Sequence, residues 1–426
     1  MSRTNTRLAR RQEPKYVKRR QRGLAIVIAS ALLLVGALGY IGYRVLGGGN
    51  DYQGTGNGEM ELIEIPQGAS LSEMGPQLEE KDVVKSNGAF QAAAARNPNA
   101  SRIQPGFYRL EKQMSAEEAV AALLDDENQV GLIDVTGGAT LQDVNVIGGD
   151  VRYGIFSLIE QATCDQEPCV SRKDLEHAAA ESTPEELGVP EWAREPVAKH
   201  SGDPKRLEGL IAPGEYAVNP DHSAKEILTD LITRSAKQYN DTGIVKRAEA
   251  VGLKPYGLLT AASLVEREAP AGEFDKVARV ILNRLDEPMR LEFDSTVNYD
   301  LNEVEVATKD EDRERKTPWN TYAKEGLPET PIASPSTEAI EAMEHPAEGA
   351  WKFFVTVDED GTTVFSDDFE EHQKNVDRAM ESGILDHRAR GAEEGAEPNP
   401  EQPGSEPEHD HPAGEQPEPA PQPAAQ

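Results

Sequence analysis

Cysteine is nearly absent from this sequence, since 426 residues include only Cys164 and Cys169. So low a count excludes a fold held by several disulfides. In an oxidising compartment the two thiols, with four residues between them, most simply close a short disulfide loop. A metal site would need more ligands nearby, so we expect a structural disulfide and no metal.

Positive charge is scarce outside the first residues of the chain. The net charge is −32, and residues 1–23 contribute +8, so the remaining residues carry −40. A surface this acidic argues against binding to nucleic acid and against adhesion to an anionic membrane surface.

Large apolar residues are missing from the end of the chain. After Leu385 the sequence contains no Val, Ile, Leu, Met, Phe, Tyr or Trp, and Pro, Glu, Gln and Gly dominate. A segment of this composition cannot bury enough apolar surface to fold. We therefore expect residues 387–426 to form a disordered tail.

An uncharged, mostly apolar run covers residues 24–43. As a helix it would span roughly 30 Å, the thickness of the hydrocarbon core of a bilayer. Nine basic residues and one acid precede it, an excess that retains residues 1–23 in the cytoplasm. We predict a transmembrane helix at 24–46 and hence a single-pass protein of the cell membrane whose remaining residues are extracellular. A cleaved signal peptide is the alternative, although no small-x-small cleavage site follows the run.

The patterns after a Gly-rich linker at 47–60 indicate a small α+β module at 61–130. Within it, alternating and amphipathic stretches predict a strand, two helices, a second strand and a third helix. Ser70 and Ser115 stand where helix N-caps are expected, and Glu73 completes a capping box with Ser70.

The rest of the chain divides into a connecting region at 131–205, which contains the cysteine pair, and a mixed α/β domain at 206–386. In the connecting region, residues 132–146 suggest a strand, a glycine turn and the start of a helix capped by Thr. The overall fold class expected is α+β. The elements expected in the domain at 206–386 are helices at 223–239, from Pro255 onward and at 274–285, and a β-hairpin at 352–366 with Gly361 in its turn.

The helix that begins near Pro255 carries a glutamate beside its apolar stripe. At 100° per residue, Glu266 lies about 20° from Leu259, whereas Glu268 lies about 160° from Glu266. The two glutamates should therefore occupy different environments. A carboxyl against apolar groups holds its proton near neutral pH, as an acid for glycosidic bond cleavage must. A solvated position on the helix flank is the alternative for Glu266.

Polar and aromatic residues are concentrated in two later segments, 283–299 and 317–328. Carbohydrate sites combine hydrogen-bonding side chains with aromatic faces of this kind. Taken one at a time, these residues also fit structural roles, such as capping a turn, packing in the core or pairing with a carboxylate.

Four motifs stand in order along the second half of the chain. They are ASLVEREA at 262–269, VARVILNRLDEPMRLEFDSTVNY at 277–299, TPWNTYAKEGLPETPIASPSTEAIEAMEHP at 317–346 and KFFVTVDEDGTTVFSDDFEEHQKNV at 352–376. These motifs resemble the YceG-like (MltG) family of endolytic murein transglycosylases. The resemblance covers about residues 61–386, and the module at 61–130 looks like the LysM-like subdomain of that family.

The resemblance implies which residues form the site. The catalytic glutamate of the family corresponds to Glu266. The chain departs from the family pattern in LEGLIAPGEY at 207–216, at Trp319, and at Glu329 and Thr330, which replace Pro-Gly. The residues implied to bind substrate are Asn283, Arg284, Asp294, Thr296, Tyr299, Asn320 and Tyr322.

The implied reaction is cleavage of the bond between N-acetylmuramic acid and N-acetylglucosamine in nascent peptidoglycan. Glu266 would act first as acid and then as base, closing the muramic 6-hydroxyl on C1 to give a 1,6-anhydro end. No cofactor is implied, and the partners expected are glycan strands, the cell membrane through the N-terminal helix, and cell-wall synthases. Two alternatives remain: a non-catalytic glycan-binding scaffold, and a hydrolase with Asp294 as its second carboxylate.

Overall fold

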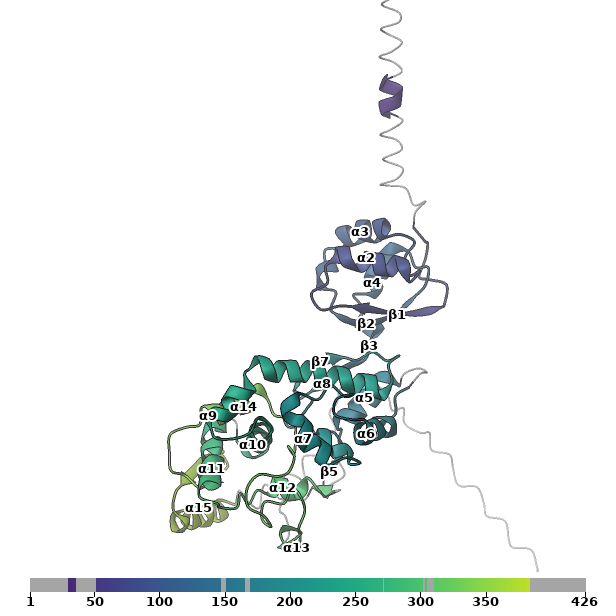
Figure 1. The fold of residues 1–426 in the computed structure, drawn as a ribbon. Coiled ribbons are helices and arrows are strands. Elements are labelled where there is room, and N and C mark those ends of the chain that lie inside the picture. The colour runs from purple at the N-terminus through teal and green to yellow at the C-terminus, as the bar shows by residue number, and fades with distance from the viewer. Residues whose placement is uncertain are drawn as a thin grey trace, which may run out of the picture.

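A computed structural model of the chain shows two folded bodies, a small one followed by a larger one (Figure 1). The sequence-based predictions for 1–23, for most of 24–46 and for the tail at 387–426 lie outside the described residues. Within the described ranges no helix combines the length and the apolar character needed to cross a membrane. The structure describes residues 30–35, 51–146, 151–164, 169–270, 272–301, 303–304 and 310–383.

The small body is a three-stranded antiparallel sheet packed with helices. The strand order is β1-β2-β3, and the β1–β2 register runs from Met60 opposite Glu111 to Ile65 opposite Gly106. The order of elements predicted from the sequence is confirmed, as is the capping box of Ser70 and Glu73. The bounds are β1 (Met60–Ile65), α2 (Leu71–Glu80), α3 (Asn87–Arg96), β2 (Gly106–Glu111), α4 (Ala116–Ala122) and β3 (Gln129–Val130).

The larger body is mostly helical and has one hydrophobic core, which extends from Ile133 to Met343. Strands β4 and β7 pair antiparallel, with Leu132 opposite Ala217. Residues 131–205 were predicted to form a connecting region. They supply a strand and three helices to this core. The bounds are β4 (Leu132–Val135), α5 (Ile155–Thr163), α6 (Arg172–Glu181), α7 (Glu191–Lys199), β7 (Gly214–Ala217), α8 (Ala224–Asp241) and α9 (Ile244–Ala250).

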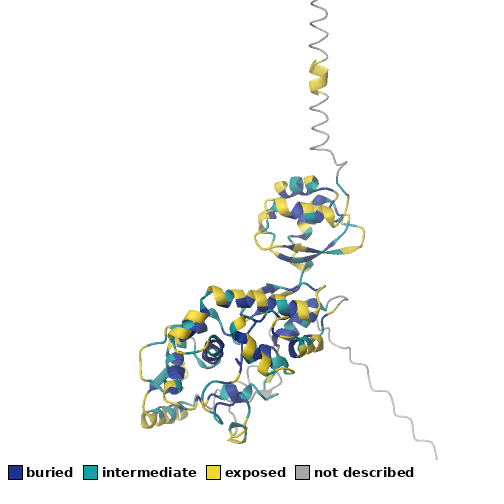
Figure 2. Cartoon of the chain, in the orientation of Figure 1, coloured by how far each residue is buried: buried dark blue, intermediate teal, exposed yellow. Residues whose placement is uncertain are grey.

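Helix α10 (Pro255–Glu268) lies in the middle of the larger body, and Figure 2 shows it in the colour of buried residues. It begins at Pro255, as predicted, because proline fits the first helical turn. Nine of its fourteen residues are buried, so only its ends are available to a site. It packs against α9, α11 (Phe274–Asp286) and α14 (Thr337–Glu344).

The predicted helix start within 132–146 is wrong. A turn and strand β5 (Val144–Val146) stand there instead. Thr140 donates its hydroxyl to the carbonyl of Gln142, and the N–H of Leu141 donates to the buried carboxylate of Glu208. These contacts hold the segment in an extended course, so tertiary partners outweigh the local helix signal.

The predicted hairpin forms near the C-terminal end of the described residues, and Gly361 in its turn has a positive φ of 80°. A disulfide joins Cys164 to Cys169 at the end of α5. The remaining elements are β6 (Val151–Arg152), α12 (Asp294–Asn298), β8 (Glu303–Val304), α13 (Asp310–Arg313), β9 (Phe353–Thr356), β10 (Thr363–Ser366) and α15 (Phe369–Ser382).

Candidate active site

The last turn of α10 presents three consecutive charged residues, Glu266, Arg267 and Glu268, none of which is fully buried. Successive helical residues point about 100° apart, so the three side chains reach different neighbours. This turn is where the central helix leaves the core, and the candidate site is built around it.

Glu266 is held by the residue that caps the start of another helix. Its Oε2 accepts hydrogen bonds from the backbone N–H of Ser336 at 2.9 Å and from the Ser336 hydroxyl at 2.6 Å. Ser336 is the N-cap of α14, and its hydroxyl oxygen accepts from the N–H of Ala339 at 3.1 Å. The expectation of apolar surroundings for Glu266 is therefore wrong, because polar donors at a helix start meet its carboxylate.

Gly137 lies on the other side of the same carboxylate, in the turn after β4. A Cβ at this position would overlap Oε1 of Glu266 and come within 3.1 Å of its Cδ. The turn is fixed by two backbone hydrogen bonds, from Gly138 to Ser334 at 2.9 Å and from Ser334 to Ala139 at 2.8 Å. The close approach leaves no room for a side chain beside Oε1.

Arg267 extends along the same turn. Its Nη1 lies 3.5 Å from the carbonyl of Gly138, at the limit of a hydrogen bond. Burial lowers the pKa of the Arg267 guanidinium, and repulsion from Arg152 acts in the same direction, whereas Glu268, Glu208 and Glu266 oppose it. The turn thus places a positive charge next to the carboxylate of Glu266.

Glu268 faces α12 rather than α14. Burial raises its pKa, and the negative charge of Asp294 adds to that effect, while hydrogen bonding with Ser295 opposes it. The carboxyl group that burial affects in this turn is thus that of Glu268, for which no role was predicted from the sequence. The prediction that the two glutamates occupy different environments is confirmed.

Two of the predicted substrate-binding residues, Asp294 and Tyr322, come together beside Glu268. Tyr322 donates its hydroxyl to Oδ1 of Asp294 at 2.8 Å, and Nη2 of Arg313 lies 3.2 Å from the same oxygen. The Arg313 guanidinium also stacks over the Tyr322 ring, 4.9 Å from its centroid. Burial, with the Asp294 charge, raises the pKa of Tyr322. The result is a partly exposed cluster of polar and aromatic groups.

Tyr299 belongs to a second cluster, with Glu208 and Trp319. Its hydroxyl donates to Oε2 of Glu208 at 2.7 Å, and its ring packs edge-on against Trp319 at 5.3 Å. Lys205 lies over both rings, 4.7 Å and 5.2 Å from their centroids. Burial raises the pKa of Glu208 to about 7, against the hydrogen bonds from Tyr299 and Leu141.

The other predicted binding residues use their side chains to hold the protein together. Asn283 donates to the carbonyls of Gly349 and Trp351, and Arg284 to those of Lys352, Arg290 and Leu291. These bonds tie α11 to the segment before the closing hairpin.

Thr296 and Asn320 are also committed to internal bonds. The Thr296 hydroxyl bonds to the carbonyl of Phe293 and to the hydroxyl of Thr321. The Asn320 amide donates to the carbonyls of Asp312, Arg313 and Arg315. The structure thus gives Thr296 and Asn320 positions in the site walls. Asp294, Tyr299 and Tyr322 are partly exposed, as is Asn283, whose amide donates to backbone carbonyls.

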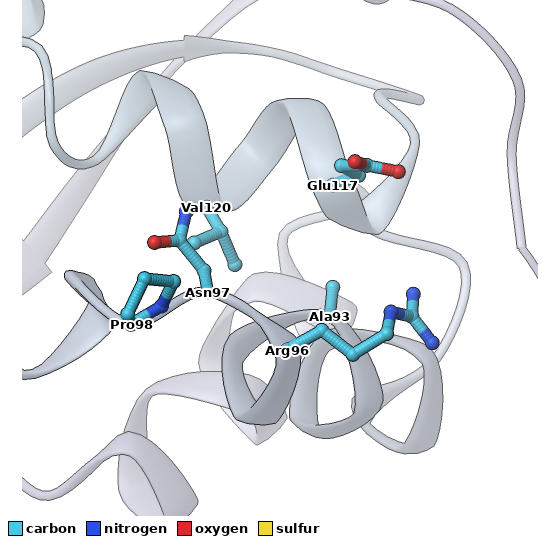
Figure 3. Close-up of a pocket in the computed structure, with 6 residues that line it drawn as sticks. All are labelled: Ala93, Arg96, Asn97, Pro98, Glu117 and Val120. Carbon is cyan, nitrogen blue, oxygen red and sulfur yellow. The ribbon is translucent and has the colours of Figure 1, made fainter.

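A separate cavity of about 280 Å³ lies in the small body, between the ends of α3 and α4 (Figure 3). Arg96 and Glu117 bring opposite charges to it, and none of the predicted site residues lines it. In the described part of the chain, no three His, Cys, Asp or Glu side chains group together as metal ligands. The lining residues are Ala93, Arg96, Asn97, Pro98, Glu117 and Val120.

Sequence reasoning missed Ser336, Gly137 and Glu208. A serine just before an acidic, apolar-periodic stretch signals a helix N-cap, and Ser336 fits that pattern. The Gly137-Gly138 pair after a strand signals a turn where another group approaches closely. Neither signal indicates that the group approached is Glu266.

The fold and this geometry define a mixed α+β protein with a candidate site centred on one hydrogen-bonded glutamate. The YceG-like family matches residues 63–378, and the chain belongs to that family. An endolytic murein transglycosylase of Bacillus subtilis (strain 168) is 30% identical over 325 residues, which cover 75% of this chain and 85% of that protein.

Two further proteins are similar to this chain. An endolytic murein transglycosylase of Streptococcus pneumoniae serotype 2 (strain D39 / NCTC 7466) is 26% identical over 370 residues, covering 83% of this chain and 64% of that protein. The crystal structure of a yceG-like protein from Listeria monocytogenes, 26% identical, covers 74% of this chain and 99% of its own, with a TM-score of 0.48.

Proposed function

We propose that this protein is an endolytic murein transglycosylase that cleaves the bond between N-acetylmuramic acid and N-acetylglucosamine in nascent glycan strands. The observation that carries the proposal is the 30% identity to the Bacillus subtilis endolytic murein transglycosylase, over 85% of that protein. The products would be strands that end in 1,6-anhydro-muramic acid, and cleavage would terminate glycan polymerisation.

Glu266 is the proposed acid and base. Glu266 lies in the last turn of α10 and is partly exposed, as an acid that meets a substrate must be. It would protonate the bridging oxygen as the glycosidic bond breaks and then remove the proton of the muramic 6-hydroxyl as that oxygen bonds to C1. Neither step needs a second carboxylate, which agrees with Glu268 facing another wall.

The cluster of Asp294, Tyr322 and Arg313 is proposed to bind the sugar, together with Tyr299. The carboxylate, hydroxyls and aromatic rings in these clusters match what a pyranose offers, namely hydroxyl groups around an apolar face. In this view Asn283, Arg284, Thr296 and Asn320 support the walls of the substrate site and do not touch the sugar.

The location of the enzyme is also a proposal. The basic segment 1–23 and the apolar run 24–43 support a single-pass anchor with a cytoplasmic N-terminus and an extracellular active site. The small body is proposed to be a LysM-like module that holds glycan strands near the membrane. Cell-wall synthases are the proposed partners.

The test is mass spectrometry of uncrosslinked nascent glycan strands after incubation with the full-length protein in detergent. Internal fragments with 1,6-anhydro-muramic ends, absent with Glu266→Gln, are expected. Circular dichroism should show that the variant is folded. Intact strands that still bind the protein would replace the proposal with a glycan-binding scaffold, and reducing ends would replace it with hydrolysis.

A further inference from the structure

We infer that Ser336 is a positioning residue that holds Oε2 of Glu266, and that Oε1, the oxygen beside Gly137, is the one that exchanges a proton with the substrate. The inference rests on the proposed function and identifies which atom of the site reacts. It is carried by contacts on both sides of the carboxylate.

Both hydrogen bonds from Ser336 reach the same oxygen. The N–H and the hydroxyl donate to Oε2 at 2.9 Å and 2.6 Å. The hydroxyl proton has a fixed direction, because the hydroxyl oxygen already accepts from the N–H of Ala339. The lone pairs of Oε2 are therefore occupied by two donors of the protein.

Oε1 has a different environment. No residue in the part of the chain that the structure describes donates a hydrogen bond to it. Its close neighbour is Gly137, where a Cβ would overlap it. The absence of a side chain at Gly137 lets the turn lie against Oε1 without displacing the carboxyl group. Because no donor of the described residues occupies the lone pairs of Oε1, this oxygen is the one left to exchange a proton with a glycosidic oxygen.

The segment that carries Ser336 is itself anchored to the site. The N–H of Ile332 donates to the hydroxyl of Ser263 on α10 at 3.1 Å. Ser334 and the turn after β4 exchange the two backbone hydrogen bonds described above. These tethers fix Ser336 and Gly137 relative to each other and to α10. A catalytic group whose supporting residues are locked in this way does not have to reorganise during the reaction.

Gly137→Ala is a direct probe of the inference. The backbone of Gly137 has an ordinary φ, so alanine fits without strain there, and the atom that must shift is the end of a flexible side chain. We expect the melting temperature to stay unchanged and kcat to fall roughly 100-fold, because a displaced catalytic group costs about that much. Gly257→Ala in α10, where a Cβ makes only an ordinary contact, is the matched control with unchanged kcat.

Ser336→Ala is the second probe. We expect kcat to fall roughly tenfold with KM within about threefold of the native value, because one hydrogen bond to a charged group is lost. Ser336→Thr, which keeps the hydroxyl, should restore activity. Ser223→Ala removes the N-cap of α8, which has the same chemistry away from the site, and should lower the melting temperature without changing kcat.

The outcomes separate this inference from the proposed function. If the native protein makes no anhydro ends, the proposed function fails. If the native protein is active and Glu266→Gln is not, native kcat in Gly137→Ala overturns the inference alone. The same conclusion follows if Ser336→Ala loses only stability, as Ser223→Ala does, or if threonine fails to restore kcat.

Discussion

The hydroxyl of Tyr299 and the backbone N–H of Leu141 donate to the same carboxyl group, that of Glu208, and so join two distant segments of the larger body. Leu141 follows the turn that contains Gly137, and Tyr299 follows α12. Glu208 therefore connects two walls of the candidate site from within the core, where its side chain is only 1% exposed.

Glu208 should make the stability of the larger body depend on pH. Its folded pKa of about 7 lies above its ordinary value of 4.5, so the folded state holds the proton more tightly between those values. The contribution of this group to stability is then greatest below about pH 4.5 and is lost as pH rises through 7, a change of about 3 kcal/mol. Glu208→Gln keeps an acceptor for Tyr299 but does not titrate. In this variant the free energy of unfolding should therefore depend less on pH between about 4.5 and 7.

Denaturant titrations of both proteins from pH 5 to pH 8 measure this effect. The native protein should lose more stability over the interval than Glu208→Gln does. Parallel curves for the two proteins would mean that Glu208 is ionised in the fold throughout.

Arg206 should be essential to stability. It is 1% exposed and donates to the carbonyls of Ala179 and Ser182, which end α6. Arg206→Ala leaves both carbonyls without this donor, and we expect a loss of roughly 3 kcal/mol. Arg234→Ala on α8 is the control, because that arginine is exposed and pairs with Asp230 at the surface. Equal losses in urea denaturation would contradict the assigned role of Arg206.

Asn320 and Tyr322 should respond differently to substitution, although both belong to the same motif. Asn320→Ala removes the donor to three carbonyls of the 312–315 segment, so a loss of roughly 2 kcal/mol in stability is expected. Thermal unfolding of the purified variant measures it. An unchanged melting temperature would contradict this structural role and favour the predicted role of Asn320 in substrate binding.

Tyr322→Phe should instead affect binding. Asp294 keeps its ion pair with Arg313 in this variant, so the change in stability should stay below about 1 kcal/mol. Loss of a hydroxyl at the proposed sugar site should raise KM roughly fivefold, as measured with glycan strands of defined length. A KM equal to that of the native protein would show that the Tyr322 hydroxyl does not contribute to substrate binding.

The disulfide between Cys164 and Cys169 should stabilise the larger body without affecting the chemistry. It closes a loop of a few residues after α5, a constraint worth about 2 kcal/mol. The double variant Cys164→Ser, Cys169→Ser should therefore unfold at lower denaturant concentration while its kcat stays native. A large fall in kcat would show that the loop contributes to the site.

Much of the local structure could be predicted from sequence, because its causes are local. The caps at Ser70 and Ser115, the start of α10 at Pro255 and the turn at Gly361 depend on neighbouring residues alone. The predictions failed where distant groups decide the outcome. The segment around Thr140 is extended because Glu208, far along the chain, takes the N–H of Leu141.

Predictions of the site also succeeded where the cause is local and failed where distant residues decide the outcome. Helical spacing separated Glu266 from Glu268 correctly, since that depends only on the geometry of α10. Which carboxyl is desolvated depends on what packs against each one, and Ser336 and Asp294 come from later segments. Asn283 lies in the same motif as Tyr299, and Asn320 in the same motif as Tyr322. Sequence alone does not reveal that the side-chain amides of the two asparagines donate to backbone carbonyls.

The position of Ser336 in the chain has a consequence for biosynthesis. The surroundings of Glu266 come from Gly137, which is translated early, and from Ser336, which is translated late. A ribosome-bound or truncated polypeptide that stops before α14 contains the glutamate but not the donors that hold it. Catalytic activity therefore arises only once nearly the whole larger body has been synthesised and folded. Partial translation products should not cleave glycan strands.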